Sequence, residues 1–461
     1  MFSNFIKTCF RNITRHKGFS FINIAGLTLG LTGCLLIGLF VRDEKQYDKF
    51  IPGADRIFRV YQQSEADFTN IIATAPPAFA TALEQNYPEV ERTLRVVSIN
   101  SNELFEVKDK KMYQQNGFIA DSNFFQFFPV RFRSGSPVKV LEGPNSIVIS
   151  AGMAKQFFGN ENPIGKDIIM NKSVLTVKGV LEENQKFHLA INYIISMALA
   201  GYKGDIMQSW QWYPFNTYVM LQKGANSQEL ERKFQSYSKP FLKGDGPSNI
   251  PHFQPLLNIH LHSSDFKYEM SERGNISYVN ALTIIAIFIL LIACFNFVNL
   301  ATSKSVQRAK EVGVRKTIGA GRKQLILQFI GETVFLSFIS IALAVAATYF
   351  LLPSLNRFTE KQMEFGLFAN PVLAISLIAL AVVVGILAGF YPALVLSAFK
   401  PIKVLKGNVV ADTSAGKTPW LRHGLVVIQF SLSVLMIISA IVVISQVSYM
   451  HNKDLGFRKE Q

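Results

Sequence analysis

The chain has 461 residues with a formal net charge of +15, and 49% of its residues are hydrophobic. The basic residues lie beside apolar stretches, because residues 1–17, 303–324 and 399–422 carry +4, +6 and +4 of this charge. Lysine and arginine gather on the cytosolic side of membrane proteins, so the pattern indicates membrane topology. It excludes a nucleic-acid-binding protein, in which the cations would form a patch on a soluble domain.

Five apolar stretches are each long enough to cross a bilayer as a helix, which takes about 20 residues. We place these transmembrane spans at residues 18–41, 277–302, 325–352, 371–398 and 423–447. The first is longer than the apolar part of a signal peptide and is followed by charged residues instead of a cleavage site, so we expect it to be retained. The predicted fold class is therefore an α-helical transmembrane bundle of about five spans.

The charge of the connecting segments sets the expected orientation in the membrane. Residues 1–17 face the cytosol, where apolar and basic positions at helical spacing predict an amphipathic helix in the membrane interface. The basic segments 303–324 and 399–422 are also cytosolic, and the net-neutral loop 353–370 lies outside. The sequence thus predicts a multi-pass protein of the inner (plasma) membrane.

Residues 42–276 separate the first two spans and are expected to form a large extracytoplasmic domain of mixed α and β structure. Runs rich in β-branched and aromatic residues predict strands at 55–61, 146–149, 174–180, 218–221 and 260–262. Apolar residues at helical spacing predict helices at 76–87 and 151–158, the second capped by Ser150. The domain contains no cysteine, so its stability has to come from its own core.

Candidate chemical groups in this domain are sparse. His260 and His262 could place two imidazoles on one strand face, but no third metal ligand lies nearby in the sequence, so we prefer a solvated strand face. The acidic pairs at 43–44 and 182–183 are interpreted as surface charge, and the aromatic residues at 210–213 as core or membrane-rim side chains. We predict no catalytic residue, no bound cofactor and no metal site.

A relaxed phosphate-loop pattern occurs at residues 411–418. That motif binds phosphate only between a buried strand and a helix, whereas this stretch lies in a linker between two spans. The match is interpreted as chance, and the chain is not expected to hydrolyse ATP by itself.

Polar residues and glycines inside the spans are expected to serve helix packing. Hydrogen bonds between helices are predicted for Asn296, Asn299 and Gln429, and Glu332 could pair with a basic residue of 303–324. Close helix contacts are predicted at Gly26, Gly30, Gly33, Gly385 and Gly389.

The segment Arg308-Ala-Lys-Glu-Val-Gly-Val-Arg-Lys-Thr-Ile-Gly-Ala320, with Gln328, Phe329 and Glu332 after it, resembles the signature of MacB/FtsX-type ABC transporter permeases. Gly389-Phe-Tyr-Pro-Ala393 is similar to the exit of the fourth span in that family. In the outer domain, Asn162-Pro-Ile-Gly-Lys166 resembles the MacB-like periplasmic core domain. The resemblance extends over essentially the whole chain.

The resemblance implies a permease subunit without an ATPase domain of its own, which docks a separate cytosolic ABC ATPase that binds the ATP. Segment 303–324 would be the coupling helix, and its docking residues would be Lys304, Arg308, Lys310, Glu311, Gly313, Arg315, Lys316 and Gly319. Glu311, Arg315 and Lys316 would make the charged contacts, and the two glycines would allow close approach and a turn. ATP hydrolysis would move the outer domain, for export or for mechanotransmission to a periplasmic substrate or effector.

One departure concerns the C-terminal part of the chain. Trp420-Leu-Arg-His423 and the fifth span are similar to the start of a second copy of the unit that opens at Arg15-His-Lys17. Residues 448–461 would then begin a second outer domain. We therefore expect either a fragment of a longer permease or a chain that needs a second permease half or a homodimer.

Two other classes of protein compete with this interpretation. The first is a membrane-anchored sensor whose outer domain binds a ligand, although the cytosolic segments seen in the sequence are too short to form a signalling domain. The second is a secondary transporter, which is disfavoured by the large inserted domain and by the lack of an ionisable relay across the spans. An ATPase encoded beside this protein would favour the permease.

Overall fold

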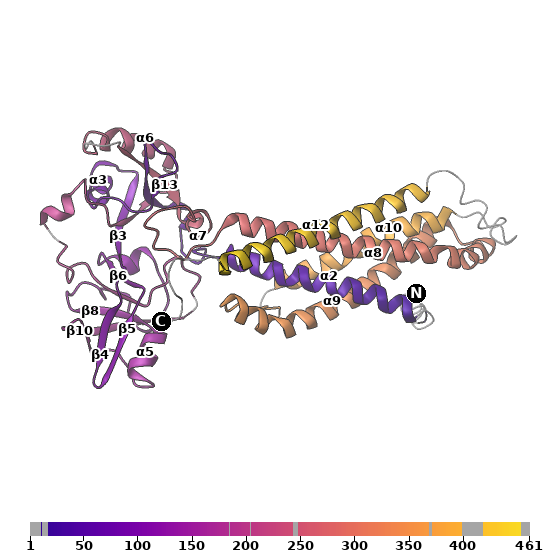
Figure 1. Ribbon diagram of the computed structural model, residues 1–461, viewed down its shortest axis with the longest axis horizontal. Coiled ribbons are helices and arrows are strands. Elements are labelled where there is room, and N and C mark those ends of the chain that lie inside the picture. The colour runs from indigo at the N-terminus through magenta and orange to yellow at the C-terminus, as the bar shows by residue number, and fades with distance from the viewer. Residues whose placement is uncertain are drawn as a thin grey trace. The chain divides into compact units, whose positions relative to one another are not determined.

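The computed structural model describes residues 11, 17–183, 185–202, 204–242, 248–367, 371–398 and 418–452, without the side chains at 19, 303–311, 391–392, 395–396, 398, 418–422 and 451. The chain divides into two compact units, an outer unit of residues 43–278 and a membrane unit of residues 1–42 and 279–461 (Figure 1). Of the predicted N-terminal amphipathic helix, only Arg11 and Lys17 are among the described residues. Of the phosphate-loop-like stretch, only the backbone at 418 is described.

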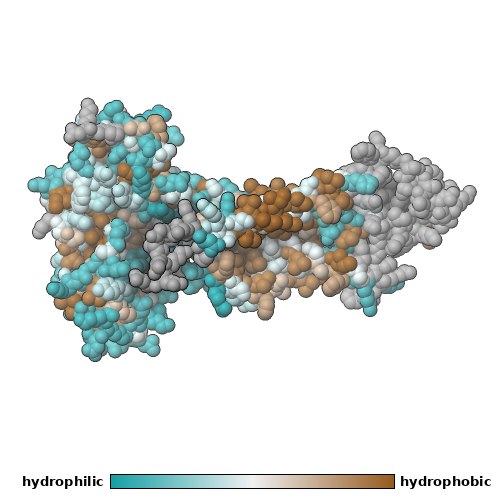
Figure 2. Space-filling view, in the orientation of Figure 1, coloured by the Kyte–Doolittle hydropathy of each residue, from teal (hydrophilic) through white to brown (hydrophobic). Residues whose placement is uncertain are grey.

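The membrane unit contains five long helices: α2 (Lys17–Glu44), α8 (Ile276–Thr317), α9 (Arg322–Thr359), α10 (Pro371–Ala398) and α12 (Thr418–Asn452). Each has a stretch long and apolar enough to cross a membrane. Figure 2 shows hydrophobic side chains over the surface of these helices, as expected of helices whose outer faces meet lipid. The five predicted spans therefore correspond to five helices.

The helices pack closely at glycines, as predicted. A Cβ atom added at Gly30 of α2 would lie 2.5 Å from the Cβ of Ala293 in α8, and one at Gly385 of α10 would lie 2.5 Å from the Cα of Val334 in α9. The predicted hydrogen bond between helices is present too, because the Asn299 side-chain N–H donates to Gln429 Oε1 of α12 over 3.0 Å. Backbone contact and buried amide pairs thus hold this bundle together.

The outer unit is built on one sheet of thirteen strands. The strands are β1 (Ile57–Ser64), β2 (Ile71–Ile72), β3 (Val90–Ile99), β4 (Glu103–Val107), β5 (Lys110–Gln114), β6 (Gly117–Ala120), β7 (Phe132–Gly135), β8 (Ser146–Ser150), β9 (Asp167–Met170), β10 (Ser173–Leu181), β11 (Tyr193–Ser196), β12 (Asn216–Leu221) and β13 (Asn249–Pro255). Eleven of them follow the order β13-β1-β12-β3-β6-β11-β8-β10-β9-β4-β5, with β2 beside β1 and β7 beside β10. Most neighbours are antiparallel, whereas β11 runs parallel to β6 and β10 to β8.

Short helices cover two parts of this sheet. They are α3 (Ala78–Asn86), α4 (Phe124–Phe127), α5 (Ala151–Phe158), α6 (Ser227–Ser238) and α7 (Ile259–His262), with 3₁₀ turns at Ala54–Arg56, Gly204–Gln208 and Leu256–Asn258. α3 and α6 pack on β3, β12 and β13, and α5 packs on β8 and β10. Separate apolar clusters lie under the two groups of helices, so one sheet carries two lobes.

Most elements predicted for the outer unit are confirmed, and one is wrong. β1, β8, β10 and β12 lie at predicted strand positions, and α3 and α5 at predicted helix positions. The Ser150 hydroxyl accepts a hydrogen bond from the Met153 N–H over 3.1 Å, which is the predicted N-cap. His260–His262, predicted as a strand, instead belongs to the short helix α7, where His260 is buried and His262 exposed.

Candidate functional site

The predicted coupling segment is not a separate helix. α8 continues without a break from the apolar stretch through residue 303 and ends only at Thr317, so most of segment 303–324 is an extension of that helix. Four of the predicted docking residues, Lys304, Arg308, Lys310 and Glu311, lie on this extension, but their side chains are outside the described part of the chain. We call residues 312–324 the hairpin tip, because they join α8 to α9.

A tight turn built around glycine closes the hairpin tip. The N–H of Gly319 donates to the Lys316 carbonyl over 3.1 Å, and the N–H of Ala320 donates to the Arg315 carbonyl over 3.0 Å. Gly319 has a φ of +101°, a region that residues with a Cβ rarely adopt. The predicted role of Gly319 in a turn is therefore consistent with the backbone, and the pattern of bonds is that of a helix C-cap.

A small apolar cluster fixes the hairpin tip to α10. Val312, Leu325, Phe329 and Ala393 are all buried in it, so it joins α8, α9 and α10. Gly313, which was predicted to allow close approach, is buried on the same turn of α8 as Val312.

Arg315 and Lys316 are engaged within the hairpin and are not wholly directed outward, contrary to what docking alone would suggest. Arg315 donates to Gln328 Oε1 over 2.8 Å, and Gln328 donates to Glu332 Oε1 over 3.2 Å. Lys316 Nζ donates to the backbone carbonyl of Ser397 in α10 over 2.7 Å. Both side chains are half-buried, so they stabilise the packing of the three helices.

The position of Lys316 has an electrostatic consequence at the end of α10. Its ammonium contacts a carbonyl in the last turn, where a helix presents unpaired carbonyls and a partial negative charge. Burial first, and the nearby charge of Arg322 second, lower the pKa of Lys316. Arg322 lies beside it and donates to the Ser397 hydroxyl over 3.4 Å.

The outward surface of the hairpin tip is apolar with a basic edge. Ile318 is 80% exposed and Val314 46% exposed. Arg322 and Lys323, in the first turn of α9, are exposed as well. Sequence reasoning did not select Ile318, and the signal for it was its place next to the turn glycine, where no helix face remains to bury it.

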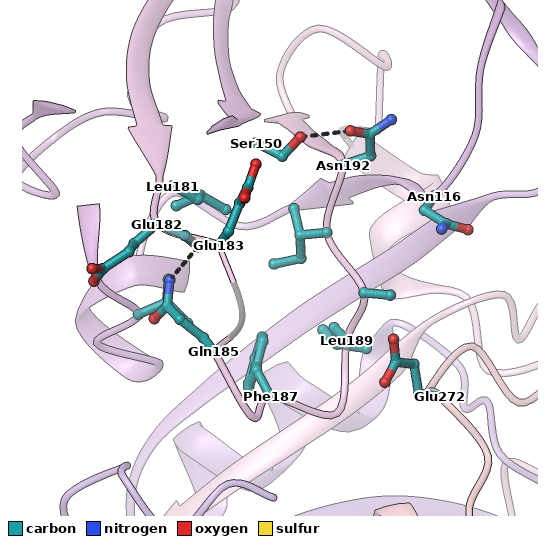
Figure 3. A pocket seen from close by; sticks show the side chains of 13 residues that line it. Asn116, Ser150, Leu181, Glu182, Glu183, Gln185, Phe187, Leu189, Asn192 and Glu272 are labelled. Atoms are coloured by element: carbon teal, nitrogen blue, oxygen red, sulfur yellow. Dashed lines mark hydrogen bonds between the residues drawn. The ribbon is translucent and has the colours of Figure 1, made fainter. Parts of the chain in front are cut away.

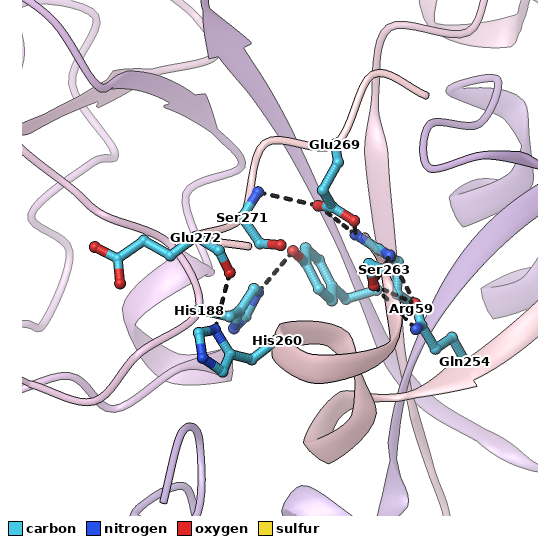
Figure 4. A network of polar contacts seen from close by, with 9 residues as sticks. Arg59, His188, Gln254, His260, Ser263, Glu269, Ser271 and Glu272 are labelled. Carbon is cyan, nitrogen blue, oxygen red and sulfur yellow. Dashed lines mark hydrogen bonds and ion pairs between the residues drawn. The ribbon is translucent and has the colours of Figure 1, made fainter. Parts of the chain in front are cut away.

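In the outer unit, a buried polar network surrounds His260 (Figure 4). Its Nε2 lies 2.9 Å from Glu44 Oε2, and its Nδ1 lies 2.9 Å from the carbonyl oxygen of Glu272. The ring stacks on Tyr47 at 3.5 Å between centroids, and the Tyr47 hydroxyl donates to Glu272 Oε2. Both imidazole nitrogens therefore have partners inside the protein, which leaves no nitrogen to bind a metal.

The acidic pair at 43–44, predicted as surface charge, is buried instead. Asp43 pairs with Lys186 at 2.8 Å and Glu44 with His260. These partners lie more than 140 residues away along the chain, so the pairs tie the last two residues of α2 to two later segments of the outer unit. The pair at 182–183 is exposed, as predicted.

A second histidine, His188, lies in a triad-like arrangement. Its Nδ1 is 2.9 Å from Asp48 Oδ1 and its Nε2 is 2.8 Å from the Tyr218 hydroxyl. All three side chains are almost completely buried, so no substrate can reach them. The arrangement is that of a satisfied core histidine in the fold.

A pocket of about 360 Å³ opens near the N-terminus of α5 (Figure 3). Its polar lining includes Glu182, Glu183, Ser150 and Asn192. The Ser150 hydroxyl donates to Asn192 Oδ1 and accepts from the Met153 N–H, so its hydrogen bonds serve the N-cap of α5. Within the described ranges, no three histidine, cysteine or acidic side chains converge as a metal site.

Comparison with known families accounts for both units. Residues 20–237 match the MacB-like periplasmic core domain, and residues 283–401 match the FtsX-like permease C-terminal domain. The chain belongs to the MacB/FtsX-type family of ABC transporter permeases. It is thus a multi-pass membrane protein of this family, with a mixed α and β periplasmic domain between its first two spans.

Named relatives share this arrangement at low identity. The chain is 23% identical over 402 residues to a "Probable export ATP-binding/permease protein" of Pseudomonas fluorescens, covering 85% of this chain and 58% of that protein. It is 21% identical over 336 residues to the macrolide export ATP-binding/permease protein MacB of Neisseria gonorrhoeae, covering 72% and 47%. The chain therefore spans about half the length of these relatives.

Among solved structures, the periplasmic region of MacB from Actinobacillus actinomycetemcomitans is similar to part of the chain. The match covers 41% of this chain and 84% of that structure at 16% identity, with a TM-score of 0.32.

Proposed function

We propose that this chain is the transmembrane subunit of an ABC transporter and that a separate cytosolic ABC ATPase binds its hairpin tip. Family membership supports the permease role, and the names of the relatives join an ATP-binding part to a permease. The single observation that carries the docking site is the exposed apolar end of a stiff, basic hairpin. ATP is bound and hydrolysed by the partner, and this chain contributes no catalytic residue.

The chemistry of the hairpin tip specifies the surface that the partner has to present. Ile318 projects beyond the turn and needs an apolar cavity, because leaving a large side chain exposed forgoes about 1.5–3 kcal/mol of burial energy. Arg322 and Lys323 next to it favour an acidic rim around that cavity. The basic α8 extension at 304–310 adds to the same field.

Force applied to the hairpin tip would pass to three helices at once. Lys316 connects the end of α8 to the end of α10, and Arg315 connects α8 to α9 through Gln328. The buried cluster around Phe329 supports both connections. We therefore assign Arg315 and Lys316 a transmitting role inside the hairpin as well as the docking role expected from the family resemblance.

The N-terminus and the hairpin tip are assigned to the cytosol and residues 43–278 to the periplasm, since the basic segments flank one side of the spans. Movement of the spans would displace the periplasmic domain and act on a substrate or effector there, by export or by mechanotransmission. A second permease half or a second copy of this chain would supply the other coupling hairpin.

The test is co-purification of the full-length chain with an ABC ATPase, identified by mass spectrometry, in wild type and in Ile318→Glu. The matched control is Val138→Glu, which adds the same charge to an apolar residue that is 65% exposed in the outer unit. We expect Ile318→Glu to lose the ATPase and Val138→Glu to retain it. Equal retention in both would refute docking at the hairpin tip.

A charge reversal of Arg315 and Lys316 answers a different question. It should reduce the thermal stability of the purified chain as well as ATPase binding, because both residues have partners inside the hairpin. Loss of binding with unchanged stability would show that these two residues act only at the docking surface.

A further inference from the structure

The structure points to a peptide-binding groove on the outer unit, at a gap in the sheet between β3 and β12. A pocket of about 470 Å³ lies there, within the usual range of about 300–1,000 Å³ for ligand sites. Four separate segments line it, including the end of β3 and residues 211–214 before β12. All of its lining residues belong to the outer unit, so the inference does not depend on the proposed ATPase partner.

The strand register shows which backbone groups face the groove. The Arg95 N–H donates to the Asp121 carboxylate and the Arg95 C=O accepts from the Asp121 N–H, both on the β6 side, so the odd-numbered residues of this part of β3 direct their backbone groups toward β6. The even-numbered residues direct theirs toward β12, and Val96 pairs there with Asn216. Ser98 is the next residue of this series, and its N–H and C=O therefore point into the groove.

The neighbouring strand does not satisfy Ser98. β12 begins at Asn216, and the same antiparallel register places Pro214 opposite Ser98. Proline has no N–H to donate. No hydrogen bond joins the Ser98 backbone to another described residue on this side, while Val97 and Ile99 remain paired with β6. A short unpaired strand edge inside a groove is the feature that an extended peptide recognises by adding a strand.

Aromatic side chains form the walls of this groove. Trp212 and Tyr213 are each 39% exposed and Tyr268 is 68% exposed, although aromatic rings of this size are usually covered. The Trp212 ring packs against Phe215 at 5.5 Å, nearly perpendicular, so its position is fixed before a ligand arrives. Tyr268 has a φ of +55°, a conformation that costs free energy and is concentrated at functional sites.

The charge of the lining restricts the peptide. Glu269 is the only charged residue among those that line the groove, but its side chain is completely buried and paired with Arg59 at 2.7 Å, so the lining presents no net charge (Figure 4). None of the lining residues therefore offers a charge to an ionised side chain or to a terminal carboxylate. We propose that this groove binds an extended, uncharged peptide segment of a periplasmic partner, which hydrogen-bonds to Ser98 and rests its side chains on Trp212, Tyr213 and Tyr268.

The probe for this proposal is the capped peptide acetyl-Thr-Val-Thr-Val-amide, compared with the same peptide N-methylated at alternate residues. The reporter is Trp212 fluorescence in the full-length chain in nanodiscs, with Trp210→Phe and Trp420→Phe leaving Trp212 as the single remaining tryptophan of three. We expect a saturable change in Trp212 fluorescence with the first peptide. The methylated peptide should bind at least about ten-fold more weakly, because it loses backbone donors.

Two matched variants test the aromatic wall. Tyr268→Ala should weaken binding, whereas Tyr113→Ala, which removes a tyrosine that is 69% exposed elsewhere on the same unit, should not. Hydrogen exchange on the apo chain adds a check that needs no ligand, since the Ser98 amide should exchange much faster than those of Val97 and Ile99. Equal binding of the two peptides, no saturable change with either, equal loss in both tyrosine variants, or a protected Ser98 amide would each overturn the proposal.

Discussion

The contact between α9 and α10 gives a specific prediction, because the close approach of the two helices depends on Gly385 having no side chain. In Gly385→Ala the new methyl would lie 2.5 Å from the Cα and 2.8 Å from the Cγ2 of Val334. Carbon atoms in contact prefer about 3.5–4.0 Å, so the two helices have to separate by about 1 Å. The Thr333 hydroxyl, which lies 2.8 Å from the Gly385 carbonyl, would be drawn away from that oxygen.

The magnitude follows from three contributions. Overpacking of this size costs about 1–3 kcal/mol. The hydroxyl contact adds about 0.5–1 kcal/mol, at the low end because Thr333 can turn to the Ile330 carbonyl of its own helix. Replacing glycine by alanine inside a helix stabilises the helix by about 1 kcal/mol, which offsets part of this cost. We expect a net destabilisation of about 0.5–3 kcal/mol.

The control is Gly38→Ala in α2, where an added Cβ meets nothing within 4 Å. It gains the same helix propensity without a clash, so the two variants should differ by about 1.5–4 kcal/mol. The assay is thermal unfolding of the full-length chain in detergent, followed by the fraction that remains monodisperse on size-exclusion chromatography. Equal thermal stability of the two variants would refute the argument that backbone contact holds α9 to α10.

Two further predictions concern buried pairs of the outer unit. Burial raises the pKa of the Glu269 carboxyl, but the charge and hydrogen bonds of Arg59 outweigh it and the net pKa is lowered. Glu269 therefore contributes stability that is present above its ordinary pKa and is lost as the pH falls through the lowered pKa of the folded state. Urea unfolding of the wild type should show this loss of stability at low pH. A Glu269→Gln variant should not show this pH dependence. Glu44→Gln and His260→Phe should show a coupling of about 1–3 kcal/mol in a double-mutant cycle, and additive effects would contradict a direct pair.

Much of the architecture could be predicted because its causes are local. Runs of apolar residues specify the five long helices, and the distribution of lysine and arginine suggests their orientation. Ser150 was recognised as a helix cap because the rule needs only the three residues that follow it. Buried glycine contacts and the Asn299–Gln429 bond were also anticipated, since polar and small residues inside spans have few other uses.

The errors concern side chains whose partners are remote in sequence. Glu44 was expected on the surface, but its partner His260 lies 216 residues later. Lys316 was predicted to make a docking contact, which stays a prediction, but its bond to the Ser397 carbonyl was missed because nothing near Lys316 in the sequence indicates that partner. The groove beside Ser98 was missed for a similar reason, since it depends on where β12 begins and on the proline that precedes it.

α8 determines how a displacement travels along this molecule. Its 42 residues form one helix, which at about 1.5 Å per residue is about 63 Å long, roughly twice the thickness of the hydrocarbon core of a bilayer. It contains no proline, the usual cause of a sharp kink, and its single glycine lies within the last two turns. The helix is therefore stiff along its axis. A rotation or axial displacement applied near Thr317 is transmitted to Ile276 through an unbroken series of backbone hydrogen bonds.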